Sequence, residues 1–119
     1  MKKRSLNLLL LVSLLLAFVM ALGIPPYLEG KKLRQNKDLV LQQSLWVLRR
    51  GIEFYTVDLK NPPNSLQDLV DRKYLREIPV DPFTQSNQTW VLENSESGIT
   101  DVHSNASGAD SSGKPYNQY

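Results

Sequence analysis

The sequence predicts an α+β fold, in which a long N-terminal helix packs against a short helix and a small antiparallel sheet. Three observations support this. An uncharged apolar run covers Leu6–Ile24, apolar residues then recur at helical spacing as far as Leu59, and two short alternating segments follow a proline-rich break. A chain of 119 residues holds one domain at most. The part after Ile24 is long enough for a modest, marginally stable core.

The apolar run Leu6–Ile24 is long enough to cross a membrane, since about 20 apolar residues at 1.5 Å each span the hydrocarbon core. Three basic residues, Lys2, Lys3 and Arg4, precede it. The positive-inside rule therefore places the N-terminus in the cytoplasm and the remainder of the chain across the membrane, in the periplasm. A single-pass anchor in the bacterial inner membrane is the favoured interpretation.

A cleavable secretory signal is the alternative for the same run. The basic start and leucine-rich centre fit it, and Val19–Ala21 could serve as a small-residue cleavage site. The run is long for the apolar region of a signal, and Met20–Ile24 does not make a clean cleavage site. These two features favour an anchor that is retained.

The helix is expected to continue past Pro25 and Pro26 with a kink and without a stop, and to end before Asn61–Pro62, because a residue before proline is pushed out of the helical region. A helix over residues 6–59 would be about 80 Å long. Lateral packing against copies of itself is the usual reason for such a helix in a chain of this size.

A heptad-like stripe predicts which face of this helix forms the core. Its members recur at steps of three and four residues: Leu41, Leu45, Leu48, Ile52, Tyr55 and Leu59. We expect Val40, Val47 and Phe54 to widen the stripe on one side. Trp46 falls outside it, either partly exposed or at a subunit contact. Gly51 either permits a close approach of the cap or has no role.

A compact cap is predicted after the proline break. Ser65 and Asp68 form a capping box that starts a short helix ending near Arg72. Its apolar residues, which should face the stripe of the long helix, are Leu66, Leu69 and Val70. The segment Glu77–Phe83 contains two prolines and should be extended, with a turn starting at Asp81–Pro82.

A hairpin is predicted from the next two alternating segments, Thr89–Leu92 and Ile99–Val102, which Asn94–Gly98 connects. The tail of residues 104–119 carries no core signal before Tyr116 and Tyr119. The expected organisation is a basic start and anchor in residues 1–27, a periplasmic domain in residues 28–103 and a C-terminal loop in residues 104–119.

Charge is unevenly distributed along the chain. Residues 25–76 hold ten basic and six acidic side chains, whereas residues 77–119 hold one basic and six acidic ones. In a pair of identical copies, the basic region 25–76 of one copy could contact the acidic region 77–119 of the next. Alternatively, both surfaces could simply be solvated. The net charge of +2 is too small to indicate a nucleic-acid partner.

The chain offers few side chains for catalysis or metal binding. It has no cysteine and a single histidine, His103, with Asp101 two residues earlier on the same strand face. Zinc and nucleophile sites need more partners of the right kind. Ser104 beside His103 does not make a dyad by adjacency. We therefore predict no enzyme, and no catalytic, cofactor-binding or metal-ligating residue.

Several segments, in this order, resemble the type IV pilin-like proteins, and most of all the major pseudopilin of type II secretion systems. The matching segments are residues 52–58 (IEFYTVD), 62–70 (PPNSLQDLV), 74–83 (YLREIPVDPF) and 98–104 (GITDVHS). The resemblance covers roughly residues 45–119. It implies a subunit of a short periplasmic filament, extracted from the inner membrane by an assembly platform and packed helix against helix with copies of itself or other pseudopilins. Its role would be assembly in protein secretion.

The N-terminus departs from that family. Its members carry a glycine and a phenylalanine at the peptidase site and a glutamate shortly after, whereas this chain reads Lys3-Arg4-Ser5-Leu6 and has no acidic residue before Glu29. A membrane-anchored, monomeric periplasmic adaptor or binding domain is therefore the alternative.

The family's C-terminal loop can hold calcium through aspartates and carbonyls. Here the available ligands are Asp110, with Asp101 and the carbonyls of the serine-rich loop. Calcium takes six to eight oxygen ligands, several of them from carboxylates, so these residues give little support for a calcium site. A polar loop tied down by Tyr116 is expected instead.

Overall fold

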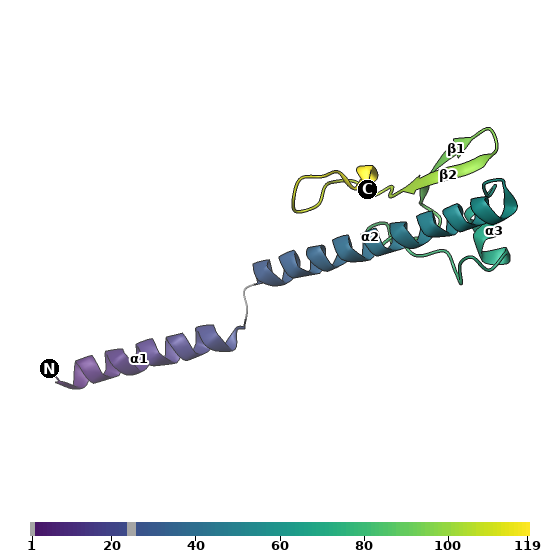
Figure 1. Cartoon of the computed structure of the whole chain (residues 1–119). Helices are drawn as coiled ribbons and strands as arrows, with labels where there is room; N and C mark the ends of the chain where they lie inside the picture. Colours follow the sequence, from purple (N-terminus) through teal and green to yellow (C-terminus); the bar gives the residue numbers. More distant parts are fainter. Residues whose placement is uncertain (1, 24–25) are drawn as a thin grey trace. The chain divides into compact units, whose positions relative to one another are not determined.

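The computed structural model describes residues 2–23 and 26–119, and its elements confirm the α+β fold (Figure 1). In chain order they are α1 (Lys2–Ala21), α2 (Pro26–Leu59), α3 (Leu66–Asp71), β1 (Val91–Ser95), β2 (Gly98–His103) and the 3-10 helix η1 (Tyr116–Gln118). Contacts within the chain group it into two units, Met1–Leu33 and Arg34–Tyr119.

The first helix stops before the prolines, so the prediction of one continuous, kinked helix was wrong. Gly23 adopts a left-handed φ of 74°, and its N–H bonds the carbonyl oxygen of Met20 at 3.4 Å. A glycine in this conformation is a common helix C-terminal cap. The next helix begins at Pro26, since the first helical turn needs no N–H there. Pro25, where the kink was expected, lies outside the described residues.

The predicted stripe of α2 is confirmed as the core. Leu41, Leu45, Leu48 and Ile52 are each at most 5% exposed. Tyr55 is buried as well, and Leu59 packs at the edge. Around these residues gather side chains from the cap and the C-terminal segment. The cluster also contains Leu66, Leu69, Leu75, Trp90, Ile99, Val102, Ala106 and Tyr116.

Two residues expected to widen the stripe do not. Val40 is 51% exposed and Phe54 is 53% exposed, although Val47 packs against the core as predicted. At about 100° per residue, all three lie roughly 100–140° from the centre of the stripe. The cap reaches that far around α2 beside Val47, which lines one pocket with Tyr74 and Leu75, but not beside Val40 or Phe54.

Gly51 permits the close approach that the sequence left open. A Cβ atom at this position would lie 3.2 Å from Cδ2 of Leu75 and 3.4 Å from Cδ1 of Leu69. Both leucines belong to the core. The glycine therefore makes room for the cap, at the usual helix-propensity cost of about 1 kcal/mol.

The capping box of α3 is confirmed. The Ser65 hydroxyl accepts the Asp68 N–H at 3.2 Å, and the Asp68 carboxylate accepts the Ser65 N–H at 3.0 Å. Leu66 and Leu69 are buried and Val70 packs beside them, so α3 faces the core of α2 with the predicted residues.

The turn at Asp81–Pro82 is also confirmed, and it anchors the tail. Asp81 is fully buried and bridges to Ser86, and its carboxylate accepts the N–H of Phe83 and the hydroxyl of Ser104. Ser104 is fully buried too. Trp90, just before β1, donates its indole N–H to the carbonyl oxygen of Pro79 at 2.9 Å.

The hairpin forms, but with a longer ladder and a bulge. Ser95 pairs with Gly98, so only Glu96 and Ser97 remain of the predicted loop, and Thr89 precedes the first strand. Glu93 pairs with Asp101 while the next residue pairs with Ile99, which leaves Thr100 as an extra residue. An extra residue shifts the alternation of side chains between the two faces of the sheet. Ile99 and Val102, three positions apart, can therefore both point to the core, and both are buried.

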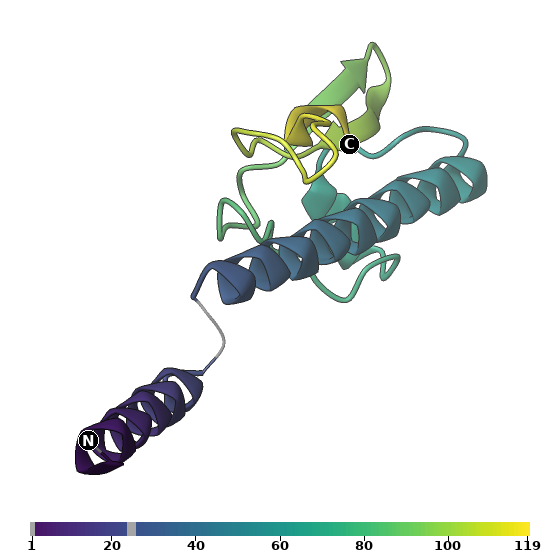
Figure 2. The same ribbon diagram turned by 90° about the vertical axis from the view of Figure 1, so that its left-hand side faces the viewer.

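The hairpin and the C-terminal segment lie along the same side of α2 in both views (Figures 1 and 2). The tail joins the core earlier than predicted, because Ala106 is buried ten residues before Tyr116. The core of this unit is therefore formed between one face of α2, the hairpin, α3 and the tail.

Candidate functional site

The face of α2 turned away from the core carries a line of large apolar side chains. Leu39, Trp46, Phe54 and Val57 are 53–65% exposed. At about 100° per residue they lie on a band roughly opposite the buried stripe. We call these four residues the outward stripe. Trp46 was expected to be exposed or at a subunit contact, and its exposure is confirmed.

Arg50 lies within this band and contacts both of its aromatic residues. Its guanidinium carbon is 5.8 Å from the ring centroid of Trp46 and 5.3 Å from that of Phe54. One of its nitrogens also pairs with Glu53 at 2.7 Å. Cation–π contacts of this kind are worth about 0.5–1 kcal/mol at exposed sites. They order the two aromatic side chains along the helix.

A groove flanks the outward stripe on the side of the C-terminal segment. From α2 it is lined by Trp46, Arg49 and Arg50, and from the tail by Asp110 and Tyr119. The lining therefore combines charges of both signs with aromatic surface. It joins the outward stripe to the edge of the cap within the unit Arg34–Tyr119.

In the first unit, α1 is uncharged after its basic start and apolar except for Ser5, Asn7 and Ser13, and none of its residues is buried. By length and composition it is the one helix among the described residues that could cross a membrane. Such a helix near the N-terminus serves as a membrane anchor or as a signal sequence.

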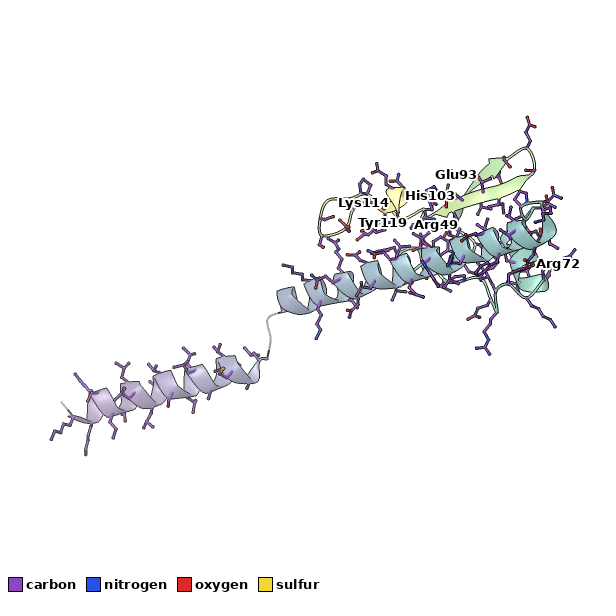
Figure 3. The ribbon with its side chains drawn as sticks, viewed as in Figure 1. Arg49, Arg72, Glu93, His103, Lys114 and Tyr119 are labelled. Carbon is purple, nitrogen blue, oxygen red and sulfur yellow. The ribbon has the colours of Figure 1, made fainter. Side chains whose placement is uncertain are left out.

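Arg49 holds the cap and the C-terminal segment to α2 (Figure 3). Its Nε donates to Oδ1 of Asp101 at 2.8 Å. Its Nη2 donates to the main-chain oxygens of Val102 at 3.0 Å and Tyr119 at 2.7 Å. No local sequence pattern indicates this role, because the partners lie 52 to 70 residues away along the chain.

His103 is the centre of a second polar group on the hairpin. Its Nδ1 lies 2.8 Å from the main-chain oxygen of Tyr119, and its Nε2 lies 2.8 Å from Oε1 of Glu93 and 3.6 Å from Oδ2 of Asp101. The predicted shared face of Asp101 and His103 is confirmed. Sequence reasoning missed Glu93, which the strand register places directly opposite Asp101.

The two titratable groups at this point shift in opposite directions. Partial burial opposes charge on His103, but its hydrogen bonds to the Tyr119 oxygen and to Glu93 raise its pKa above the usual value. Burial also opposes charge on Asp101, yet the Val102 N–H and Arg49 lower its pKa. Carboxylates and imidazole therefore stabilise each other's charged forms here.

The C-terminal loop is tied down as expected. The buried Tyr116 donates its hydroxyl to Oδ1 of Asp38 at 2.9 Å. Asp110 accepts hydrogen bonds from the Ser112 N–H and hydroxyl, the Lys114 N–H and the Tyr119 hydroxyl. These donors, with Ser112 contributing most, lower the pKa of Asp110 well below its ordinary value.

The two aspartates considered for calcium belong to separate hydrogen-bonded groups. Asp110 is bonded within its own loop, whereas Asp101 is bonded to Arg49 and faces His103. Among the described residues, one group of three acidic or histidine side chains has all its ligand atoms within 4.8 Å of one another, namely Glu93, Asp101 and His103.

Comparison of the chain with family models gives no match. Neither the curated proteins nor the solved structures contain a match. The order of elements, an apolar N-terminal helix followed by a long helix, a short helix and a small antiparallel sheet, is consistent with a pilin-like arrangement.

Proposed function

We propose that this protein is a membrane-anchored, pseudopilin-like subunit that acts in protein secretion by assembling helix to helix with copies of itself or with related subunits. The observation that carries the proposal is the outward stripe on α2. Four large apolar side chains in one line, none covered by the cap, suit a helix that packs against neighbouring helices.

The remaining features support this proposal in different ways. The apolar helix α1 suits storage of the subunit in the inner membrane, with the basic residues Lys2, Lys3 and Arg4 in the cytoplasm. Two of the cap segments that resemble the major pseudopilin of type II secretion systems, residues 62–70 and 98–104, include α3 and the second strand of the hairpin. The periplasmic part would then be the unit after the anchor.

A monomeric membrane-anchored adaptor is the second candidate, and one observation favours it. The chain lacks the glycine and phenylalanine of a prepilin cleavage site and has no acidic residue before Glu29. An adaptor would keep its N-terminus uncut and would bind its partner through the acidic side of the cap.

Cysteine crosslinking in native membranes separates the two. The natural chain has no cysteine, so single substitutions Leu8→Cys and Leu15→Cys on α1 report only their own contacts. Both side chains are well exposed, at 64% and 65%. A filament subunit should give ladders of crosslinked oligomers when the secretion system is present.

A matched control places the cysteine at Glu96, an exposed residue in the turn of the hairpin that belongs to neither α1 nor α2. This position should give monomers or far weaker ladders. If Leu8→Cys and Leu15→Cys also gave only monomers with the secretion system present, the filament proposal would fail and the adaptor would be supported. Measuring the mass of the mature protein would also show whether a peptidase cuts the chain near its N-terminus.

A further inference from the structure

The imidazole of His103 has a fixed orientation. Its Nδ1 lies 2.8 Å from the main-chain oxygen of Tyr119. A main-chain oxygen only accepts hydrogen bonds, so Nδ1 must carry a proton. In the neutral ring the lone pair therefore belongs to Nε2, on the opposite edge of the imidazole.

That lone pair points at two carboxylates. Oε1 of Glu93 lies 2.8 Å from Nε2, and Oδ2 of Asp101 lies 3.6 Å from it. Three electron-rich atoms thus converge within 4.8 Å of one another. Such an arrangement is stable only with a positive species between them, either a proton on Nε2 or a metal cation.

The spacing suits a metal cation. Zinc binds imidazole nitrogen and carboxylate oxygen at about 2.0–2.2 Å, so neighbouring ligand atoms around a tetrahedral ion lie roughly 3.3–3.6 Å apart. The separation between Nε2 and Asp101, 3.6 Å, lies at the upper end of this range, whereas that between Nε2 and Glu93, 2.8 Å, is about 0.5 Å too short. To admit an ion, the exposed Glu93 side chain would have to move back, and all three ligand atoms already lie within 4.8 Å of one another.

The surroundings supply the support that metal ligands usually have. A ligating histidine typically donates its other N–H to a main-chain carbonyl or carboxylate, as His103 does to Tyr119. Arg49 holds Oδ1 of Asp101 at 2.8 Å and leaves Oδ2 facing His103. The Glu93 side chain is 59% exposed, which leaves an open side for the ion to enter and for water ligands.

We propose that Glu93, Asp101 and His103 form a binding site for a divalent transition-metal ion of the zinc class. One imidazole nitrogen and two carboxylate oxygens are a ligand set suited to zinc, and they leave coordination positions for water. The ion would join β1 to β2 and, through the Nδ1 hydrogen bond, both strands to the C-terminal segment. The site is independent of the assembly proposed above.

The single histidine makes the test direct. We suggest titrating the untagged full chain in detergent micelles with Zn²⁺ at about pH 8, where unperturbed imidazole is mostly neutral. Nitrogen NMR of the one imidazole reports ligation at Nε2, and calorimetry gives the stoichiometry. We expect saturation at one ion per chain, with a shifted Nε2 signal and an Nδ1–H that persists.

Two variants identify the ligands. Both His103→Gln and Glu93→Gln should weaken zinc binding by about tenfold or more, since removing even a supporting residue of a metal site costs 10–100-fold. Glu96→Gln removes the same charge from the same hairpin outside the group and should bind as the natural chain does. If His103→Gln fails to fold, the zinc affinity of Glu93→Gln still tests the proposal, because the Glu93 side chain is exposed.

The proposal is overturned by an unchanged Nε2 signal at one equivalent of Zn²⁺, which would leave a proton-only site. It is also overturned if Glu93→Gln binds Zn²⁺ as tightly as Glu96→Gln. A titration with Ca²⁺ completes the test. Calcium prefers oxygen ligands, so a site that took Ca²⁺ in preference to Zn²⁺ would contradict the assignment to His103.

Discussion

The two faces of α2 carry similar side chains but meet different surroundings. On the inward face, Leu41, Leu45 and Leu48 are covered almost completely by the cap. On the outward face, Leu39 and Trp46 are about as apolar, yet each is more than half exposed. Both faces belong to the same helix and the same unit, so composition alone does not decide which residues are buried.

The difference assigns the faces different roles. The inward face is accounted for by contacts within this chain, which hold the cap on the helix. No described part of the unit Arg34–Tyr119 covers the outward face. Scattered exposed apolar residues are normal on a soluble surface, but an aligned row with an arginine stacked on its aromatics suits contact with another helix. Substitutions on the two faces should therefore have separable effects.

The largest effect is expected from Leu48→Ala on the inward face. Leu48 is fully buried, and truncating such a residue loses transfer energy and leaves a cavity, at a cost of about 2–5 kcal/mol. Urea unfolding followed by the fluorescence of the buried Trp90 would measure the loss. The matched variant Leu39→Ala on the outward face should cost less than about 0.5 kcal/mol. Equal losses of unfolding free energy in the two variants would contradict the conclusion that only the inward face is buried.

Tyr116→Phe should come next, because it removes a bond that joins the tail to the inward side of α2. The variant leaves the nearly buried Asp38 carboxylate without its phenol donor, and a hydrogen bond to a charged group is worth about 1.5–3 kcal/mol. Tyr74→Phe is the matched control, since Tyr74 makes the same kind of bond to Asp58 at an exposed site. A smaller loss is expected there.

The same bond predicts a pH dependence. Burial, followed by the hydrogen bond to Asp38, raises the pKa of Tyr116 to about 12. The folded state therefore favours the neutral phenol. Its contribution is complete below the ordinary tyrosine pKa of about 10 and is lost as pH rises from there toward 12. Unfolding of Tyr116→Phe should lack this part of the alkaline loss.

Gly51→Leu should destabilise by a somewhat smaller amount, about 1–3 kcal/mol, through overpacking. A new side chain there would meet Leu75 and Leu69 within 3.4 Å of its first carbon. Gln43→Leu adds the same residue at an exposed position on the outward side of the same helix, and should change stability by less than about 0.5 kcal/mol. Thermal unfolding of the pair would show whether the cap approaches α2 as closely as proposed.

Much of this fold could be predicted because its signals are local. Steps of three and four residues identified the buried stripe, and Ser65 with Asp68 identified the start of α3. The end of α1 after Ala21 was not predicted, because it depends on the left-handed conformation of Gly23 and comes before the two prolines. The misplaced Phe54 shows that periodicity gives the centre of a buried face better than its width.

The polar groups could not be predicted, because they depend on strand register and on contacts between distant segments. The pairing of Glu93 with Asp101 follows from a bulge at Thr100 that no sequence pattern marked. Arg49 meets partners that lie in the hairpin and at Tyr119. Asp101 and His103 were recognisable as neighbours on one strand, but the third member of their group was not.

The smallest effect on stability and the largest on assembly are expected from the outward stripe. The double variant Trp46→Ser and Phe54→Ser changes only exposed side chains, so its free energy of unfolding should stay within about 1 kcal/mol of that of the parent. A cysteine at Gln43, an exposed position on the same side of α2, reports contacts between neighbouring copies.

Crosslinking through Gln43→Cys in native membranes, with and without the double substitution, therefore tests the central claim that the outward stripe joins copies of this chain. We expect a ladder of oligomers for the parent and its loss in the double variant, with unfolding unchanged. A ladder that survives the loss of Trp46 and Phe54, or a parent that stays monomeric with the secretion system present, would contradict it.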